Sequence, residues 1–304
     1  MNEKIIGHTL AFATIFIWGV TFIFTKILLK YISPLEILIY RFLIGFCVLF
    51  LIYPKFKKIE SIKGEMLFLF LGLTGVCLYY LMESIALKYT LASNVGLIMA
   101  TIPMLTTIIA HFTIEDEKIE RRTIYGFLIA FLGVLMIIFN GRVILRLNPI
   151  GDMLAILAAI SFAIYSSLLK KVSKKYHFIQ STRKIFFYGL LFLLIFTLST
   201  QQSISFGDLL NSEILFTVLF LGIAASALCF VMWNRAINII GSIKSSNYIY
   251  LVPVITMFAS FIVLNERITY LGIIGGVLTL MGVYISENGS RIINSFSSKS
   301  RSLR

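Results

Sequence analysis

The chain has 304 residues, of which 59% are hydrophobic and only 13% are charged, and its mean hydropathy is +0.94. Soluble domains contain about 45–50% apolar and about 25% charged residues, so this composition excludes a soluble globular protein. The net charge of +13 does not indicate a nucleic-acid partner, because the basic residues lie in short segments between apolar runs. The composition therefore predicts a chain that lies in a lipid bilayer.

Long apolar runs predict about ten transmembrane helices, since a helix needs roughly 20 apolar residues to cross the hydrocarbon core. The first five are expected at residues 7–29, 34–53, 65–86, 91–112 and 122–140. The second five are expected at residues 150–170, 182–200, 213–234, 243–264 and 268–286. A basic, Ser-rich tail, residues 287–304, follows the last helix, and we expect it to be disordered. The connections are too short to form a soluble domain.

The connections alternate in charge. If the N-terminus is placed inside the cell, most of the 27 Lys and Arg residues fall in cytoplasmic connections. Cytoplasmic loops of membrane proteins carry this excess of positive charge. We therefore expect a multi-pass protein of the cell (cytoplasmic) membrane with both termini in the cytoplasm.

A pattern in the first half of the chain recurs about 150 residues later. The aligned pairs are Pro103 with Pro253, Glu117 with Glu266, Gly126 with Gly275, and Gly133 with Gly282. The pattern predicts two homologous units, residues 8–140 and 150–286, of five helices each. Because five is an odd number, the second unit is inverted in the membrane relative to the first. The expected fold is therefore an all-α integral membrane protein built from two inverted five-helix repeats.

The ordered residues of these two units resemble the EamA family of the drug/metabolite transporter superfamily. The first unit supplies Trp18-Gly19, Pro34, Arg41, Ala86, Pro103, Glu117, Gly126 and Gly133. The second supplies Trp233, Ala236, Pro253, Glu266, Gly275 and Gly282. The resemblance implies export of amino acids or other metabolites without ATP, and it leaves the substrate open. The second unit departs from the first at two positions, because Phe162 stands opposite Trp18 and Ile185 or its neighbour opposite Arg41.

Polar and aromatic side chains within the apolar runs are candidates for a substrate cavity. Amide groups both donate and accept hydrogen bonds, which lipid cannot do, so they should face protein or a cavity. For each aromatic residue, ordinary packing is the competing interpretation. The candidate cavity residues are Trp18, Tyr79, Tyr80, Glu83, Asn94, Tyr165, Trp233, Asn247 and Tyr250.

Three further residues are candidates for gating or hinge motion. Pro103 and Pro253 interrupt matched helices, and such interruptions point to a central site in transporters. Arg41 and Glu83 lie at comparable predicted depths, so we expect either a buried ion pair or snorkelling of each toward water. Glu117 and Glu266 are expected to complement the dipole of the helix that follows each of them.

The leading interpretation is a secondary transporter that works by alternating access. A membrane component of a multi-subunit transport or sensing complex is the main alternative, and an integral-membrane enzyme is a weaker one. The sequence has no HExxH, GxGD or Walker A motif and no cluster typical of a metal site, so we expect no cofactor and no metal. The expected partners are lipid and a small-molecule substrate. Protons remain a candidate coupling ion, with Glu83 as their site, and facilitated export is equally compatible. The sequence leaves the oligomeric state open.

Overall fold

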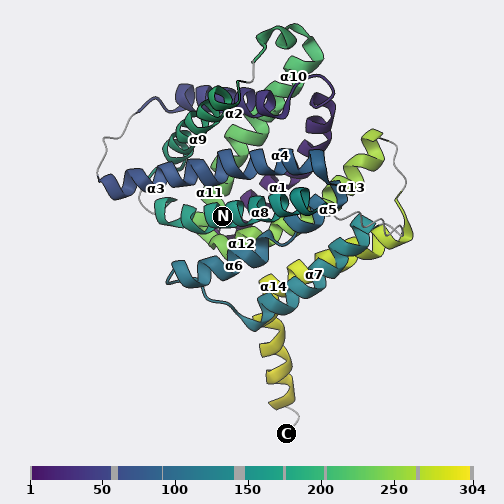
Figure 1. Ribbon diagram of the computed structural model, residues 1–304. Helices are drawn as coiled ribbons and strands as arrows, with labels where there is room; N and C mark the ends of the chain where they lie inside the picture. The colour runs from purple at the N-terminus through teal and green to yellow at the C-terminus, as the bar shows by residue number, and fades with distance from the viewer. Residues whose placement is uncertain are drawn as a thin grey trace.

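The computed structural model describes residues 2–55, 61–90, 92–139, 148–173, 176–201, 204–264 and 268–301. Within these ranges the ordered elements are all helices, and the described chain has no strand, which confirms the all-α prediction (Figure 1). Nine of the helices there are long and apolar enough to cross a membrane, and the apolar helix Tyr270–Ser286 is shorter. The expected number of about ten spans is therefore confirmed.

The first half contains five spans. The first two are the helices α1 (Glu3–Leu28) and α2 (Pro34–Ile52). The third span is continuous and comprises α3 (Ile62–Gly72), the π-helix η1 (Leu73–Leu78) and α4 (Tyr79–Tyr89). The fourth comprises α5 (Ala92–Met99) and α6 (Ile102–Thr113), and the fifth is α7 (Arg121–Phe139).

The second half repeats this plan. Its first two spans are α8 (Pro149–Ser173) and α9 (Phe178–Thr200), and the short 3₁₀-helix η2 (Phe206–Leu210) follows. The third span comprises α10 (Ser212–Phe220), the π-helix η3 (Leu221–Leu228) and α11 (Cys229–Ile240). The fourth comprises α12 (Ser242–Asn247), the 3₁₀-helix η4 (Tyr248–Tyr250) and α13 (Leu251–Leu264), and the fifth is α14 (Tyr270–Arg301).

The halves share two local irregularities as well as their helix order. Each third span carries a π-helix in its middle, and each fourth span is interrupted shortly before its proline. Pro103 lies in the first turn of α6, where its missing N–H would have no helical partner, and Pro253 is the third residue of α13. The matched interruptions expected at these prolines are therefore present, with each break placed before the proline.

Local sequence explains where α2 begins. The Ser33 hydroxyl accepts a hydrogen bond from the backbone N–H of Glu36, and the Glu36 carboxylate accepts one from the N–H of Ser33. Pro34 occupies the first helical position. This reciprocal cap satisfies donors that a helix start otherwise leaves exposed in an apolar medium.

The two halves enter the bundle from opposite ends. The 114–120 connection contacts the start of α12 at one end, which we call the Glu117 end. α1 also begins near this end, because His8 Nδ1 lies 2.9 Å from the hydroxyl of Tyr248, just after α12. α8 begins at the opposite end, where Asp152 accepts a hydrogen bond of 2.7 Å from Thr90 at the end of α4.

The fifth spans of the two halves pack directly on each other. α7 and α14 run side by side (Figure 1), with glycines at their contact points. A Cβ atom added at Gly133 would lie 2.5 Å from the carbonyl oxygen of Gly275, and one added at Gly282 would lie 2.4 Å from the nitrogen of Ala130. These glycines thus permit close backbone contact between the halves.

One expectation about the C-terminus is wrong. We expected residues 287–304 to be disordered, but α14 continues as a helix to Arg301, beyond the apolar segment that ends at Ser286. Helical hydrogen bonding propagates from an existing helix at low cost, so a polar sequence extends it readily.

Candidate substrate site

Aromatic side chains from both halves meet in the interior of the bundle. We call this group the central aromatic cluster. The first half supplies rings from α1, α2 and α4, and the second half supplies rings from α8, α9 and α11. The cluster consists of Trp18, Phe42, Tyr79, Tyr80, Phe162, Tyr165, Phe186, Phe230 and Trp233.

Trp18 connects the halves within the cluster. Its ring centroid lies 5.3 Å from that of Trp233 and 5.9 Å from that of Phe162. Phe162 in turn lies 4.7 Å from Tyr79. These distances are typical of tilted and edge-to-face aromatic pairs. The position that aligns with Trp18 in the second half, Phe162, thus packs against Trp18 itself.

The matched π-helices place the aromatic residues of α4 and α11. η1 ends immediately before Tyr79, and η3 ends immediately before Cys229, one residue ahead of Phe230. A π-helix inserts extra residues per turn, rotates the helix that follows it, and is frequent at functional sites. Gly75 in η1 also gives Tyr165 room, because an added Cβ there would lie 2.2 Å from the Tyr165 ring.

Arg41 brings a positive charge to the cluster. Its side chain is buried, and its guanidinium carbon lies 4.7 Å from the centre of the Tyr80 ring and 5.2 Å from that of Phe42. Its Nε donates a 2.9 Å hydrogen bond to the hydroxyl of Ser226 in η3. Aromatic faces stabilise a desolvated cation in this position.

Glu83 brings a carboxylate to the same region. It is buried, and it accepts a long hydrogen bond of 3.5 Å from the Tyr79 hydroxyl. The expected ion pair with Arg41 is not formed, since no nitrogen–oxygen distance of 4.0 Å or less joins these two described side chains. Snorkelling is also excluded, because both side chains are buried.

The two tryptophans of the cluster differ in their N–H groups. Trp18 Nε1 donates a 2.9 Å hydrogen bond to the carbonyl oxygen of Ala225. Trp233 is fully buried, and within the described chain its Nε1 has no hydrogen-bond partner. A buried donor without a partner is costly and is available to a ligand.

The structure brings together six of the nine candidate cavity residues: Trp18, Tyr79, Tyr80, Glu83, Tyr165 and Trp233. Two other candidates, Asn247 and Tyr250, contact α14 and α7 instead. Asn247 donates to the hydroxyl of Ser286 on α14, and the Tyr250 ring lies 6.3 Å from that of Phe127 on α7. Asn94 belongs to α5, and its side chain lies outside the described residues, as does all of Glu266. A cavity role stays a prediction for all nine candidates.

Sequence reasoning did not single out Phe42, Phe186, Phe230 or Ser226. The chain has 27 phenylalanines, so neither composition nor spacing distinguishes the three in the cluster from those that face lipid. Ser226 is one of many small polar residues in the apolar runs. One signal was present, because Phe230 lies three residues before Trp233 and so shares its helix face. Among the described residues, no group of three or more His, Cys, Asp or Glu side chains could hold a metal ion.

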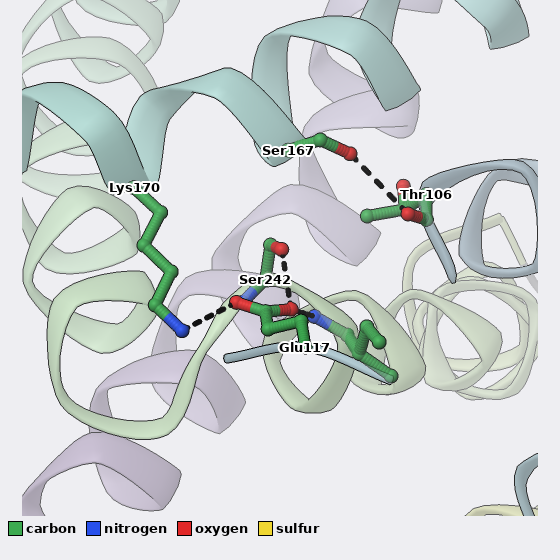
Figure 2. Close-up of polar contacts among 6 residues, drawn as sticks. Thr106, Glu117, Ser167, Lys170 and Ser242 are labelled. Atoms are coloured by element: carbon green, nitrogen blue, oxygen red, sulfur yellow. Dashed lines mark hydrogen bonds and ion pairs between the residues drawn. The ribbon is translucent and has the colours of Figure 1, made fainter. Parts of the chain in front are cut away.

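A second polar group lies at the Glu117 end, around the buried carboxylate of Glu117 (Figure 2). Oε1 accepts a 2.8 Å hydrogen bond from the N–H of Ser242 and forms a 2.7 Å ion pair with Lys170 at the end of α8. Oε2 accepts from the Ser242 hydroxyl at 2.6 Å and from the N–H of Ile243 at 2.8 Å. We call these four residues the Glu117 cluster. Glu117 therefore caps α12 of the other half, and the expectation that it serves the helix after it, α7, is wrong.

These contacts also set the protonation of Glu117. Burial alone would raise the pKa of this carboxyl, but hydrogen bonds from Lys170, Ser242 and Ile243 outweigh that effect, so its pKa lies below the ordinary value of 4.5. The carboxylate is therefore charged at neutral pH. It joins the first half, through the 114–120 connection, to two helices of the second half.

Two matched five-helix halves around a shared interior cluster are an architecture found in many membrane transporters. The model of the EamA-like transporter family matches residues 5–139 and again residues 149–287, and the chain belongs to this family. The family resemblance read from the sequence is thus confirmed.

Individual relatives agree with this assignment. An uncharacterized transporter of Archaeoglobus fulgidus is 32% identical over 292 residues, which cover 94% of this chain and 98% of the relative. The uncharacterized transporter YyaM of Bacillus subtilis is 28% identical over 281 residues, 90% of this chain and 91% of its own. A solved crystal structure with 17% identity shares the fold, with a TM-score of 0.77 over 94% of this chain and 98% of that one.

Proposed function

We propose that this transporter exports amino acids or other small organic metabolites across the cytoplasmic membrane by alternating access. The observation that carries the proposal is the central aromatic cluster, which both halves build around the buried side chains of Arg41 and Glu83. Binding sites between transporter halves are exposed to each side in turn when the halves change their packing.

The chemistry of the cluster favours a solute with both apolar and charged parts. Aromatic faces would cover the apolar part of such a solute. Arg41 would attract a carboxylate, Glu83 would attract an ammonium group, and Trp233 Nε1 would donate a hydrogen bond. Because Arg41 and Glu83 form no direct ion pair, both side chains remain available to the charged groups of a zwitterionic solute.

The charge of the connections supports one direction of insertion. The excess of Lys and Arg in alternate connections favours a cytoplasmic location for the Glu117 end and for both termini. Export would then carry the solute from the Glu117 end to the opposite end.

Purified protein in liposomes tests the proposal. Vesicles loaded with one unlabelled amino acid or amphipathic metabolite at a time are diluted into the same labelled solute, and counterflow is measured. We expect accumulation of at least one zwitterionic or carboxylate solute over protein-free vesicles. A matched control is Phe187→Leu, since Phe187 is exposed on the outside of the bundle. A panel without any accumulation, or equal loss in Phe187→Leu and Trp233→Phe, contradicts the proposal.

Glu83→Gln separates proton-coupled from facilitated export. If protons drive export through this carboxyl, an imposed pH gradient accelerates efflux by the parent protein, and the substitution removes that acceleration while counterflow continues. The measurement is initial efflux with and without the gradient. A gradient effect that survives in Glu83→Gln contradicts a role for this residue in coupling.

A further inference from the structure

We propose that Glu117 is a latch that closes the cytoplasmic end of the transport path, and that this path runs between α6, α8 and α12. The inference rests on the proposed alternating-access function. It identifies the contact that must break before a solute from the cytoplasm reaches the central aromatic cluster.

The Glu117 cluster has the connectivity that a latch needs. The carboxylate lies in the connection that follows α6, and its three partner residues belong to α8 and α12 (Figure 2). A single movement of the 114–120 connection away from α12 would therefore break three hydrogen bonds and one ion pair together. When the latch is closed, these contacts cover the place where α6, α8 and α12 meet.

The start of α12 is shaped to receive this carboxylate. Gly241 has a φ of 90°, a conformation that side-chain-bearing residues rarely adopt. A Cβ atom added to Gly241 would also lie only 3.0 Å from Glu117 Oε1. A glycine at this position thus allows both the turn and the close approach of the carboxylate.

Unpartnered hydroxyl groups lie one helical turn deeper than the latch. Ser245 is three residues beyond Ser242 on α12, and Ser166 is four residues before Lys170 on α8. The hydroxyls of Ser245, Ser166 and Thr106 are buried and have no hydrogen-bond partner in the described chain. Thr106 brings α6 to this place, because its carbonyl accepts a 3.3 Å hydrogen bond from Ser167 (Figure 2).

These hydroxyls are explained if the interface opens. A permanently closed contact between three helices is most stable when it is apolar or fully hydrogen-bonded, and an unpartnered buried hydroxyl opposes it. In a state open to the cytoplasm, water or a passing polar solute would satisfy all three groups. The three unpartnered hydroxyls lie on three helices next to the latch. We infer that they line a surface that water enters during the transport cycle.

Cysteine labelling tests the latch directly. Ser245→Cys is introduced into a Cys47→Ser background, since Cys47 is the exposed one of the three native cysteines. A membrane-impermeant thiol reagent is added to vesicles whose cytoplasmic face is outward, and the labelling rate of Cys47→Ser alone is subtracted. We expect Glu117→Gln to raise the rate by about tenfold or more, which corresponds to about 1.4 kcal/mol of lost closure.

A matched control lies in the same connection. Glu120 is half-exposed and pairs with Arg122 in its own segment, so Glu120→Gln should leave the labelling rate unchanged. If Glu117→Gln does not fold, Lys170→Gln weakens the latch while leaving the hydrogen bonds from α12 in place. Equal rates in the latch variants and their parent, or an equal rise in Glu120→Gln, would overturn the proposal.

The failure of the latch and the failure of the proposed function are distinguishable. Faster labelling in the latch variants with no counterflow of any solute leaves the latch standing and removes the export proposal. Counterflow by the parent protein with unchanged labelling in the variants does the reverse.

Discussion

The central aromatic cluster and the Glu117 cluster differ in how many polar partners their buried ionisable side chains have. Glu117 has an ion pair and three hydrogen bonds, all of 2.8 Å or less. Within the described chain, Glu83 has one hydrogen bond of 3.5 Å, and Arg41 has one to a neutral hydroxyl together with two aromatic faces. Both regions lie between the two halves of the chain, so the difference does not come from their place in the repeat.

The difference distinguishes polar groups that stabilise the fold from polar groups that remain available to bind a solute. A fully satisfied carboxylate resists ligands because any new partner must replace an existing one. A weakly satisfied carboxylate or indole N–H gains from a new partner. Substitutions in the Glu117 cluster should therefore act mainly on stability and closure, and those in the central cluster mainly on transport.

The largest expected effect is that of Glu117→Ala. Removing the carboxylate leaves the Lys170 ammonium and two N–H groups of α12 without this partner, which should destabilise the protein by about 3–5 kcal/mol. Thermal unfolding in detergent measures the change. Glu120→Ala is the control, and it should cost about 1 kcal/mol or less because the Glu120 side chain is 53% exposed. Equal destabilisation by the two substitutions would remove the contrast between the regions.

Gly75→Ala should disturb the central cluster through packing alone. The added methyl group would meet the Tyr165 ring, so we expect a loss of about 1–3 kcal/mol of stability and lower counterflow. Gly96→Ala is the control, because among the described residues an added Cβ there would meet Ile138 alone, at 3.6 Å. Unfolding temperature and counterflow are measured on both variants. Unchanged behaviour of Gly75→Ala would show that the cluster has more space around Tyr165 than this packing allows.

The substitutions Trp18→Phe and Trp233→Phe test the comparison more specifically. Each removes one indole N–H, but only that of Trp18 has a protein acceptor in the described chain, the carbonyl of Ala225. Trp18→Phe should therefore lose about 1 kcal/mol more stability than Trp233→Phe. Trp233→Phe should in turn weaken the apparent affinity for the transported solute. A reversal of the stability order would contradict the assignment of the free donor.

The smallest expected effect is the pH dependence of the latch. The folded pKa of Glu117 lies below its unfolded value, so its stabilising contribution is complete above about pH 4.5 and is lost as pH falls through the folded pKa. Unfolding temperature measured from pH 7 down to pH 3 should therefore fall more steeply for the parent than for Glu117→Gln. Parallel curves would show that other groups account for the acid sensitivity.

Much of the architecture could be predicted from the sequence. The apolar runs indicated the spans because the bilayer fixes their length, and Pro103 with Pro253 indicated the interruptions because proline removes a helical hydrogen bond. Each of these inferences depends on residues that are near one another in the chain.

The sites were less predictable because they depend on contacts between distant residues. Glu117 and Ser242 meet only when the halves are assembled, so the sequence offered the following helix as the partner of Glu117. The π-helices that orient Tyr79 and Phe230 have no simple sequence signature. Arg41 and Glu83 were expected either to pair or to snorkel toward water, but side-chain geometry places the Arg41 guanidinium against the Tyr80 ring.

The close packing of α7 on α14 restricts how the remaining helices move. A sliding of these two backbones along each other would bring bulkier side chains against Gly133 and Gly282, where there is no room even for a methyl group. We therefore expect this pair to act as a fixed axis, with the other eight spans turning about it. The axis would keep one wall of the protein sealed against lipid while the opposite wall changes shape.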